Sequence, residues 1–175
     1  MYAGVNDMHQ HSKRLLLVLL VIIMIMTLTG CGGPEGTYNQ AENLLAKGKY
    51  AEAAEKLESI NAYSDATTFA MYCRACAQAE AGDYETVVVA FSVLGNYRDS
   101  ALRSVYCLAR IGEKEAAAAD ILALQETKAL YDSIPLFLDS TERSVALNAR
   151  LQEAQYLVAI EAGEKGDYET AFSMF

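Results

Sequence analysis

The chain has 175 residues, and its 14 lysines and arginines against 23 aspartates and glutamates give a formal net charge of −9. An acidic chain does not favour nucleic acid or anionic lipid headgroups, because both reward lysine and arginine. The two histidines, His9 and His11, lie at the very start of the sequence, and tryptophan is absent. The rest of the chain therefore lacks the side chain that Ser-His-Asp catalysis, Cys-His catalysis and histidine-ligated zinc or iron require.

A hydrolase built on paired carboxylates is the enzyme class that this composition leaves open. No single pair stands out among the acidic residues, which are scattered along the chain. We therefore expect no enzyme activity, no catalytic residues, no cofactor and no metal site.

The first 31 residues have the layout of a secretory leader. Lys13 and Arg14 precede an apolar run over 15–26, which is followed by Leu-Thr-Gly-Cys at 28–31. Positive charge, then an apolar run, then small residues is the order of a signal peptide. The run is shorter than the ~20 apolar residues that span a bilayer. An uncleaved transmembrane anchor and a buried helix are the alternatives, and either Met1 or Met8 is the start.

The segment 28–31 resembles the lipobox of bacterial lipoproteins. The resemblance implies cleavage before Cys31 and a diacylglyceryl group on its sulfur, which would hold the protein on the extracytoplasmic face of a bacterial cell membrane. We therefore expect a helical signal peptide over 1–30. Residues 31–37, which include three glycines after Cys31, are expected to form the lipidated cysteine and a flexible tether.

Beyond the tether the sequence repeats itself with a period of 34 residues. Tyr-Ser-Asp-Ala at 63–66 returns as Tyr-Arg-Asp-Ser at 97–100, and Gly-Lys-Tyr at 48–50 returns as Gly-Asp-Tyr at 82–84. A fixed period of this length is typical of stacked helix–turn–helix units. The abundance of alanine, leucine and glutamate also favours helices.

Within a unit, the pattern predicts a first helix that ends at a glycine and a second helix with an apolar stripe. The first unit has these helices over 38–46 and 50–60, separated by Gly48. Asn61 and Gly95 follow the second helices, where we expect positive φ. Asp65, Asp99 and Asp139 are expected to cap the next helix by accepting its free N–H groups, although together they could also be imagined as an acidic ligand row.

The third unit is irregular. Gly112 follows Cys107 by five positions, whereas Gly82 follows Cys73 by nine, which predicts that the first helix of the third unit is one turn short. We expect a second helix near 113–124 that runs on to 131, an interruption at Pro135, a second copy of the capping turn at 137–140, and a long helix near 140–162. Phe175 lies within the expected second helix of a fourth unit. We therefore expect 38–175 to be the N-terminal part of a longer repeat domain.

Gly48, Tyr50, Ala53 and Leu57 resemble the turn and second helix of the tetratricopeptide repeat (TPR). The same pattern recurs at Gly82, Tyr84, Val87 and Phe91 and at Gly166, Tyr168, Ala171 and Phe175. Ala41, Ala75 and Ala159 fit the small residue at which that family's two helices cross. Aspartate replaces the proline that usually ends the unit, so the chain resembles a divergent aromatic-x-Asp-Ser/Ala branch. The resemblance implies an all-α fold, a right-handed α-solenoid of TPR-like repeats over 38–175.

One tyrosine recurs in the first helices, at Tyr38, Tyr72, Tyr106 and Tyr156. In the tetratricopeptide family this position can line the concave groove, so the four tyrosines are candidate partner-binding residues. Tyrosine suits an interface because it combines apolar area with a hydroxyl. The alternative is that the rings pack in the core between stacked helices.

Cysteines at 73 and 76 form a C-x-x-C pair, which suggests metal or redox chemistry. A zinc site needs about four ligands, and Cys107 is the one further cysteine beyond the leader. Because Cys73 and Cys107 share one repeat position, packing as small buried groups explains both. A disulfide between neighbouring helices and a metal site are the alternatives.

These features together predict a membrane-tethered, extracytoplasmic repeat lipoprotein that acts as a scaffold for a protein or peptide partner and binds no nucleic acid. The alternative is a stalk or adaptor region of a longer envelope protein, with a catalytic or sensor domain beyond residue 175.

Overall fold

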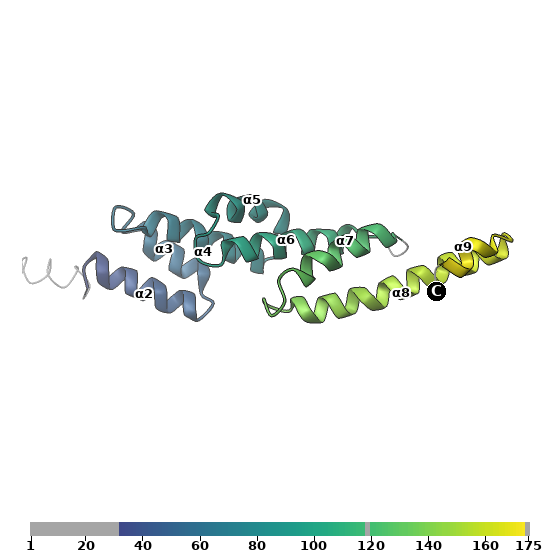
Figure 1. Ribbon diagram of the computed structural model, residues 1–175. Coiled ribbons are helices and arrows are strands. Elements are labelled where there is room, and N and C mark those ends of the chain that lie inside the picture. The colour runs from purple at the N-terminus through teal and green to yellow at the C-terminus, as the bar shows by residue number, and fades with distance from the viewer. Residues whose placement is uncertain (1–31, 118–119, 174–175) are drawn as a thin grey trace, which may run out of the picture. The chain divides into compact units, whose positions relative to one another are not determined.

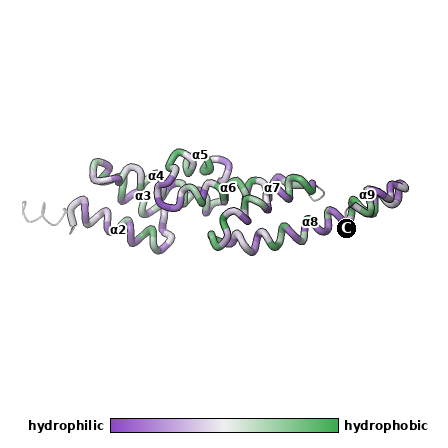
Figure 2. Tube along the Cα trace, in the orientation of Figure 1, coloured by the Kyte–Doolittle hydropathy of each residue, from purple (hydrophilic) through white to green (hydrophobic). Residues whose placement is uncertain are grey.

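The computed structural model describes residues 32–117 and 120–173. Within these residues every regular element is an α-helix and no strand occurs (Figure 1), so the all-α class expected from the repeat pattern is confirmed. The expected signal peptide and Cys31 lie outside the described residues. Hydrophobic and hydrophilic stretches alternate along the helices (Figure 2), as expected for helices that bury one face.

The helices fall into two compact units, which divide between Thr67 and Thr68, near the start of α4. In chain order the helices are α2 (Pro34–Ala46), α3 (Tyr50–Glu58), α4 (Ala66–Glu80), α5 (Tyr84–Leu94), α6 (Ser100–Glu115), α7 (Ile121–Asp132), α8 (Ser140–Glu164) and α9 (Tyr168–Ser173).

The first unit contains the hairpin of α2 and α3, whose contact buries small and apolar side chains. Ala41 from α2 and Ala53 and Leu57 from α3 are fully buried. Helix α2 begins at Pro34, so residues 34–37, expected in the flexible tether, are helical. Proline suits the first position of a helix because it lacks the N–H that would remain unbonded there.

The second unit packs its helices in chain order, with α5 against α6, α6 against α7, α7 against α8 and α8 against α9. Helix α8 has 25 residues and α7 has 12, so α8 continues well beyond α7 towards α9 (Figure 1). One hydrophobic core lies where α6, α7 and the N-terminal half of α8 meet. Its buried members are Tyr106, Ala109, Leu124, Tyr131, Ile134, Leu147, Leu151 and Ala154.

Three first helices end in the same way, as the glycine pattern predicts. Gly48, Gly82 and Gly166 have φ of 72°, 85° and 80°, values that glycine adopts without steric cost. At each site the residue after the glycine donates its N–H to a carbonyl five residues back, and the glycine donates to one three residues back. This is the Schellman arrangement, which satisfies carbonyls left free at a helix end.

The third unit differs from the expectation. Gly112 does not end a helix, because α6 continues through it to Glu115 and is as long as α4. The expected short first helix and the second helix near 113–124 are therefore wrong, and the second helix is α7. The reason lies in packing: a Cβ on Gly112 would stand 2.5 Å from the Oγ1 atom of Thr127 on α7. Gly112 is thus a point at which α6 and α7 approach each other closely.

The aromatic-x-Asp segments form one turn that occurs three times in the described residues. Ser64, Arg98 and Leu138 hold φ of 51°, 52° and 51°, in the left-handed region. In each copy the residue after the aspartate donates its N–H to the aromatic residue's carbonyl, at 3.0 to 3.1 Å. The expectation of positive φ is confirmed for Gly95, at 58°, and is wrong for Asn61.

Replacing Gly112 with alanine is expected to destabilise the fold by about 1–3 kcal/mol, because the new Cβ meets a side chain that cannot easily move. Thr127 is 3% exposed, and its hydroxyl donates to the Ala123 carbonyl at 2.7 Å. Gly163→Ala is the matched control, because Gly163 is also helical and a Cβ there meets nothing within 4 Å. Urea unfolding measures both variants. The packing argument fails if both gain the ~0.5–1 kcal/mol that alanine gives over glycine in a helix.

Candidate functional site

The four candidate tyrosines lie in different surroundings. Tyr72 and Tyr106 are 3% and 8% exposed, Tyr38 is half-buried, and Tyr156 is 51% exposed. The rings of Tyr72 and Tyr106 therefore pack between helices, the alternative that the sequence left open. Of the four, Tyr156 offers the largest surface to a partner.

The hydroxyl of Tyr72 shows the role of the repeated tyrosine in the first helices. It donates a hydrogen bond to the Oδ1 atom of Asp99, the residue that precedes α6. Its ring meets the edge of Tyr97 at a centroid distance of 6.0 Å. The Nε atom of Arg103 donates to Asp99 Oδ1 at 2.8 Å and to the tyrosine hydroxyl at 3.1 Å. A hydroxyl, a carboxylate and a guanidinium thus satisfy one another.

The same contact recurs at the other two turns. Tyr38 donates to Asp65 at 2.6 Å and packs edge-on to Tyr63 at 5.8 Å. In the second unit, Tyr106 donates to Asp139 at 2.7 Å, and Phe137 lies 6.1 Å from its ring. We call each set of tyrosine, turn aromatic and aspartate a tyrosine–aspartate joint. The described residues contain three of them.

The joints correct one expectation from the sequence. Asp99 and Asp139 do occupy the N-cap positions of α6 and α8, but neither side chain caps its helix with a hydrogen bond. Their oxygen atoms instead accept from tyrosine hydroxyls and from arginines one helical turn later. The capping role was wrong because these carboxylates accept hydrogen bonds from a tyrosine 27 or 33 residues earlier and from an arginine four residues later.

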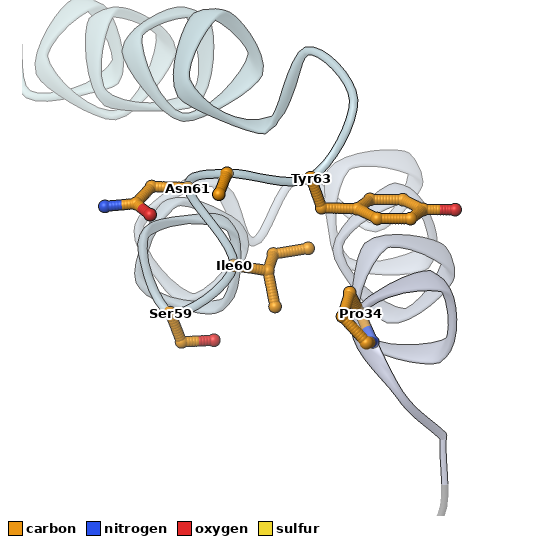
Figure 3. A pocket seen from close by; sticks show the side chains of 6 residues that line it. Pro34, Ser59, Ile60, Asn61 and Tyr63 are labelled. Atoms are coloured by element: carbon orange, nitrogen blue, oxygen red, sulfur yellow. The ribbon is translucent and has the colours of Figure 1, made fainter.

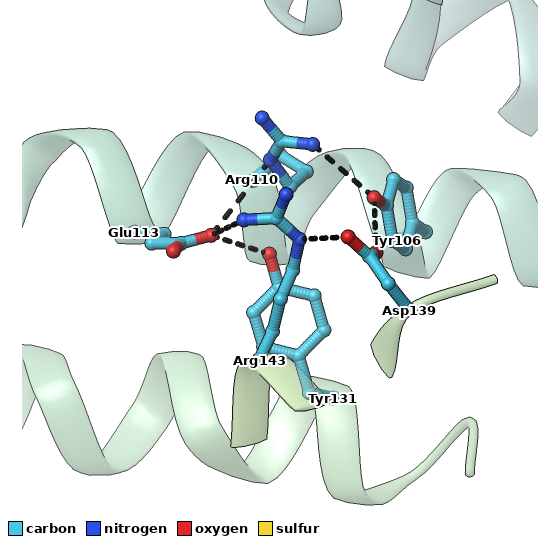
Figure 4. A network of polar contacts seen from close by, with 6 residues as sticks. All are labelled: Tyr106, Arg110, Glu113, Tyr131, Asp139 and Arg143. Carbon is cyan, nitrogen blue, oxygen red and sulfur yellow. Dashed lines mark hydrogen bonds and ion pairs between the residues drawn. The ribbon is translucent and has the colours of Figure 1, made fainter. Parts of the chain in front are cut away.

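The third joint extends into a larger polar network (Figure 4). Glu113 Oε2 accepts from the hydroxyl of Tyr131 and from Nη1 of Arg143, each at 2.8 Å, and lies 3.7 Å from Nε of Arg110. Arg143 also donates to Asp139 at 2.9 Å. Arg110 donates to the hydroxyl of Tyr106 at 3.2 Å. The charges of Arg110 and Arg143 balance those of Glu113 and Asp139, so the network has no net charge for a ligand. Because its members come from three helices, the network also links α6, α7 and α8.

Sequence reasoning missed the arginines of these joints. Arg103 and Arg143 follow Asp99 and Asp139 by four residues, a spacing that places two side chains side by side on a helix. The Asp-Ser-x-x-Arg pattern at 99–103 and 139–143 was visible in the sequence and could have identified them.

Burial and the joints shift several pKa values. Burial, and then the hydrogen bond to Asp99, raise the pKa of Tyr72 far above its usual value. The pKa of Tyr131 is raised in the same way by burial and by Glu113. Although burial acts in the opposite direction, hydrogen bonds from Tyr106 and Arg143 hold the pKa of Asp139 below its usual value. Because the pKa of Tyr106 is raised and that of Asp139 is lowered, their joint favours a neutral tyrosine and a charged aspartate.

Cys73, Cys76 and Cys107 are buried and are not joined in disulfides. Burial is the main cause that raises the pKa of Cys76 and of Cys107 to about 11, so both remain protonated at neutral pH. A buried, protonated thiol packs as a small apolar group. Among the described residues, no three or more His, Cys, Asp or Glu side chains are placed to hold a metal ion.

The first unit has a hollow of about 340 Å³, lined by residues of α2 and of the segment after α3. Figure 3 shows Pro34, Ile60 and Tyr63 around it, with Ser59 and Asn61 at its sides. None of the six described residues that line this space is charged.

The C-terminal half of α8 carries an apolar surface. Tyr156, Leu157 and Ile160 are 51%, 47% and 41% exposed, and we call these three residues the α8 patch. Their spacing of i, i+1 and i+4 places them on one side of the helix. The opposite side, with Ala159 and Ala162, is buried. The patch is a candidate surface for a macromolecular partner.

None of the helices in the described part of the chain is both long and apolar enough to cross a membrane. Comparison of the chain with protein-family models, with curated proteins and with solved structures finds no match.

Tyr72→Phe is expected to lower the free energy of unfolding by about 1.5–3 kcal/mol, because it deletes a buried hydrogen bond to a charged acceptor. Arg103 continues to neutralise Asp99, which places the loss towards the lower value. Tyr168→Phe is the matched control, because that hydroxyl is exposed and makes no hydrogen bond to the described residues. Equal stability of the two variants in urea would contradict a stabilising joint.

The fold is also expected to lose stability in alkali. Cys76 and Cys107 bind their protons more tightly in the folded protein, because their pKa values rise from the usual 9.0 to about 11. Stability is therefore full below pH 9 and falls as the pH rises towards 11, by up to about 1.4 kcal/mol per thiol and pH unit. Tyr72 and Tyr131 add to the loss above their usual 10.0.

Urea midpoints between pH 8 and pH 11 measure this decline, and absorbance at 295 nm follows tyrosine ionisation. The variant Cys73→Ala/Cys76→Ala/Cys107→Ala removes all three buried thiols, so its stability should be nearly flat between pH 9 and 10. An unmodified protein whose midpoint stays constant up to pH 11 would show that these groups are not buried as described.

Proposed function

We propose that this chain is a membrane-tethered, extracytoplasmic repeat lipoprotein of bacteria that acts as a scaffold for a protein or peptide partner and performs no catalysis itself. The leader supports the location, because Lys13 and Arg14, the apolar run over 15–26 and the Leu-Thr-Gly-Cys segment at 28–31 follow the order of a lipoprotein signal. Acyl chains on Cys31 would hold the acidic protein at a membrane that its own surface does not favour.

Residues 38–175 would form a right-handed solenoid of TPR-like units. The joints support this arrangement, because each one ties a tyrosine of one first helix to the aspartate that opens the next. The same contact at successive units is what a stacked repeat requires, since each unit buries its open face on its neighbour. The glycine-ended helices support the relation to the tetratricopeptide repeat.

The α8 patch is the observation that carries the binding role. Large apolar side chains gathered on one exposed helix face are typical of a surface that another macromolecule covers. The polar groups of the joints, in contrast, are satisfied within the protein. A binding surface with no free reactive group favours recognition over catalysis.

The lipoprotein assignment predicts that Cys31 is acylated when the full chain is made in a bacterial host. Mass spectrometry of the mature N-terminus should find Cys31 as the first residue, with a diacylglyceryl group on its sulfur. Cys31→Ser should keep its leader, because the lipid is the signal for cleavage in that family. An unmodified Cys31, or a leader retained in the unsubstituted chain, would refute the assignment.

The scaffold role is tested in the same host with a photo-reactive residue at 157. A partner is expected to cross-link there and not at 122, since Leu122 is exposed on α7, outside the patch. Equal labelling at the two positions would indicate nonspecific contact and would count against a specific binding surface.

A further inference from the structure

The linker between the expected lipid anchor and the first described helix is very short. Helix α2 begins at Pro34, so two glycines, at 32 and 33, separate it from Cys31. Gly32 has φ of 124°, and a Cβ on it would stand 3.1 Å from the Cα atom of Gly36 in the first turn of α2. The residue bonded to Cys31 therefore lies against the helix and does not extend away from it.

This linker limits how far α2 can stand from a membrane that holds Cys31. Three steps of fully extended chain, from Cys31 to Pro34, span at most about 11 Å, and the position of Gly32 against the helix shortens this reach. The headgroup layer on one side of a bilayer is about 5–7 Å thick. When Cys31 carries acyl chains, the start of α2 therefore lies in or directly above the headgroup layer.

The hollow of the first unit lies beside this same point. Pro34 lines it together with the segment that follows α3, because the start of α2 and the end of α3 meet at one end of their hairpin (Figure 3). The lining residues, none of them charged, are Pro34, Ser59, Ile60, Asn61, Ala62 and Tyr63. An uncharged and partly apolar surface thus adjoins the place where the chain would enter the membrane.

We propose that this end of the first unit docks on the headgroup region of the bilayer that holds the acyl chains of Cys31, with Pro34, Ile60 and Tyr63 facing the lipids. The inference rests on the proposed lipoprotein function and gives the first unit an orientation on the membrane. Tyrosine favours the membrane interface because its ring is apolar and its hydroxyl is polar. The uncharged lining meets the headgroups without removing water from a charged side chain.

The other surfaces of the hairpin are less suited to lipid. Lys47 and Lys49 are exposed in the turn at its opposite end, about 20 Å from Pro34 along the 13 residues of α2. Lys49 already pairs with Glu52 at 2.8 Å. Glu52 and Glu55 are exposed on α3, so a hairpin lying on that side would press carboxylates against the headgroups.

A protein partner is a poorer occupant of this hollow. A helix with its side chains is about 10–12 Å across, which is as much as the fully extended linker can reach. The linker therefore leaves no room for a partner helix between the hollow and the bilayer. The headgroups need no such room, because they lie on the side from which the chain is anchored.

The test uses tryptophan fluorescence, because the chain has no tryptophan of its own. Asn61→Trp places the probe in the lining of the hollow, and Lys47→Trp places it at the opposite end of the hairpin, both at exposed positions. Each lipidated variant is purified from the bacterial host and reconstituted in vesicles of phosphatidylcholine that carries bromine on its acyl chains near the headgroups. Bromine quenches nearby indole rings, so Asn61→Trp should lose most of its fluorescence and Lys47→Trp should keep it.

A second pair of variants separates docking from closeness imposed by the linker. Ala62→Glu adds a carboxylate to the hollow, and Ala51→Glu adds one in the first turn of α3, near the opposite end of the hairpin. Both alanines are exposed, so neither change should disturb the fold. In the Asn61→Trp background, Ala62→Glu should abolish most of the quenching, because the added charge must stay hydrated, while Ala51→Glu should leave it unchanged.

Equal quenching of the two tryptophan variants, or no quenching of Asn61→Trp, would overturn the proposal. Quenching that persists in Ala62→Glu would do so too, because the linker alone would then explain it. Mass spectrometry of the same samples separates this inference from the proposed function. An acylated Cys31 without quenching leaves the lipoprotein function standing and defeats the docking surface, whereas a Cys31 without lipid defeats both.

Discussion

The structure depends on a hydrogen bond between a buried tyrosine hydroxyl and an aspartate at the start of the next first helix. A tyrosine such as Tyr72 contributes a large apolar ring to the core, but its hydroxyl would be costly to bury without a partner. Asp99 supplies that partner, and because it is charged the bond is stronger than one between neutral groups. One residue pair thus combines ring packing with a directional contact.

The position of the aspartate has a second consequence. Asp99 and Asp139 do not cap their helices by hydrogen bonding, yet each places negative charge where the helix dipole favours it. Arg103 and Arg143, one turn later, offset the cost of burying part of this charge. Tyrosine, aspartate and arginine therefore form one unit, in which loss of any member leaves the others less well satisfied.

The irregular third unit shows how packing changes the repeat without breaking it. Gly112 occupies a helix interior because Thr127 approaches too closely for any side chain there. The polar network around Glu113 then ties α6, α7 and α8 together. Helix α8 is longer than α7, and its C-terminal half carries the apolar face that includes Tyr156.

The features that depend on local backbone chemistry could be predicted from the residues alone. The helical class, the helix ends at Gly48, Gly82 and Gly166, and the recurring aromatic-x-Asp turn follow from residues within one turn of one another. Tertiary structure decided what depends on segments far apart in the chain. The tyrosine partner of Asp99 lies 27 residues away, and Gly112 is read as a helix end until Thr127 is seen against it. A local sequence pattern cannot predict such contacts, because the packing of helices determines which distant residues meet.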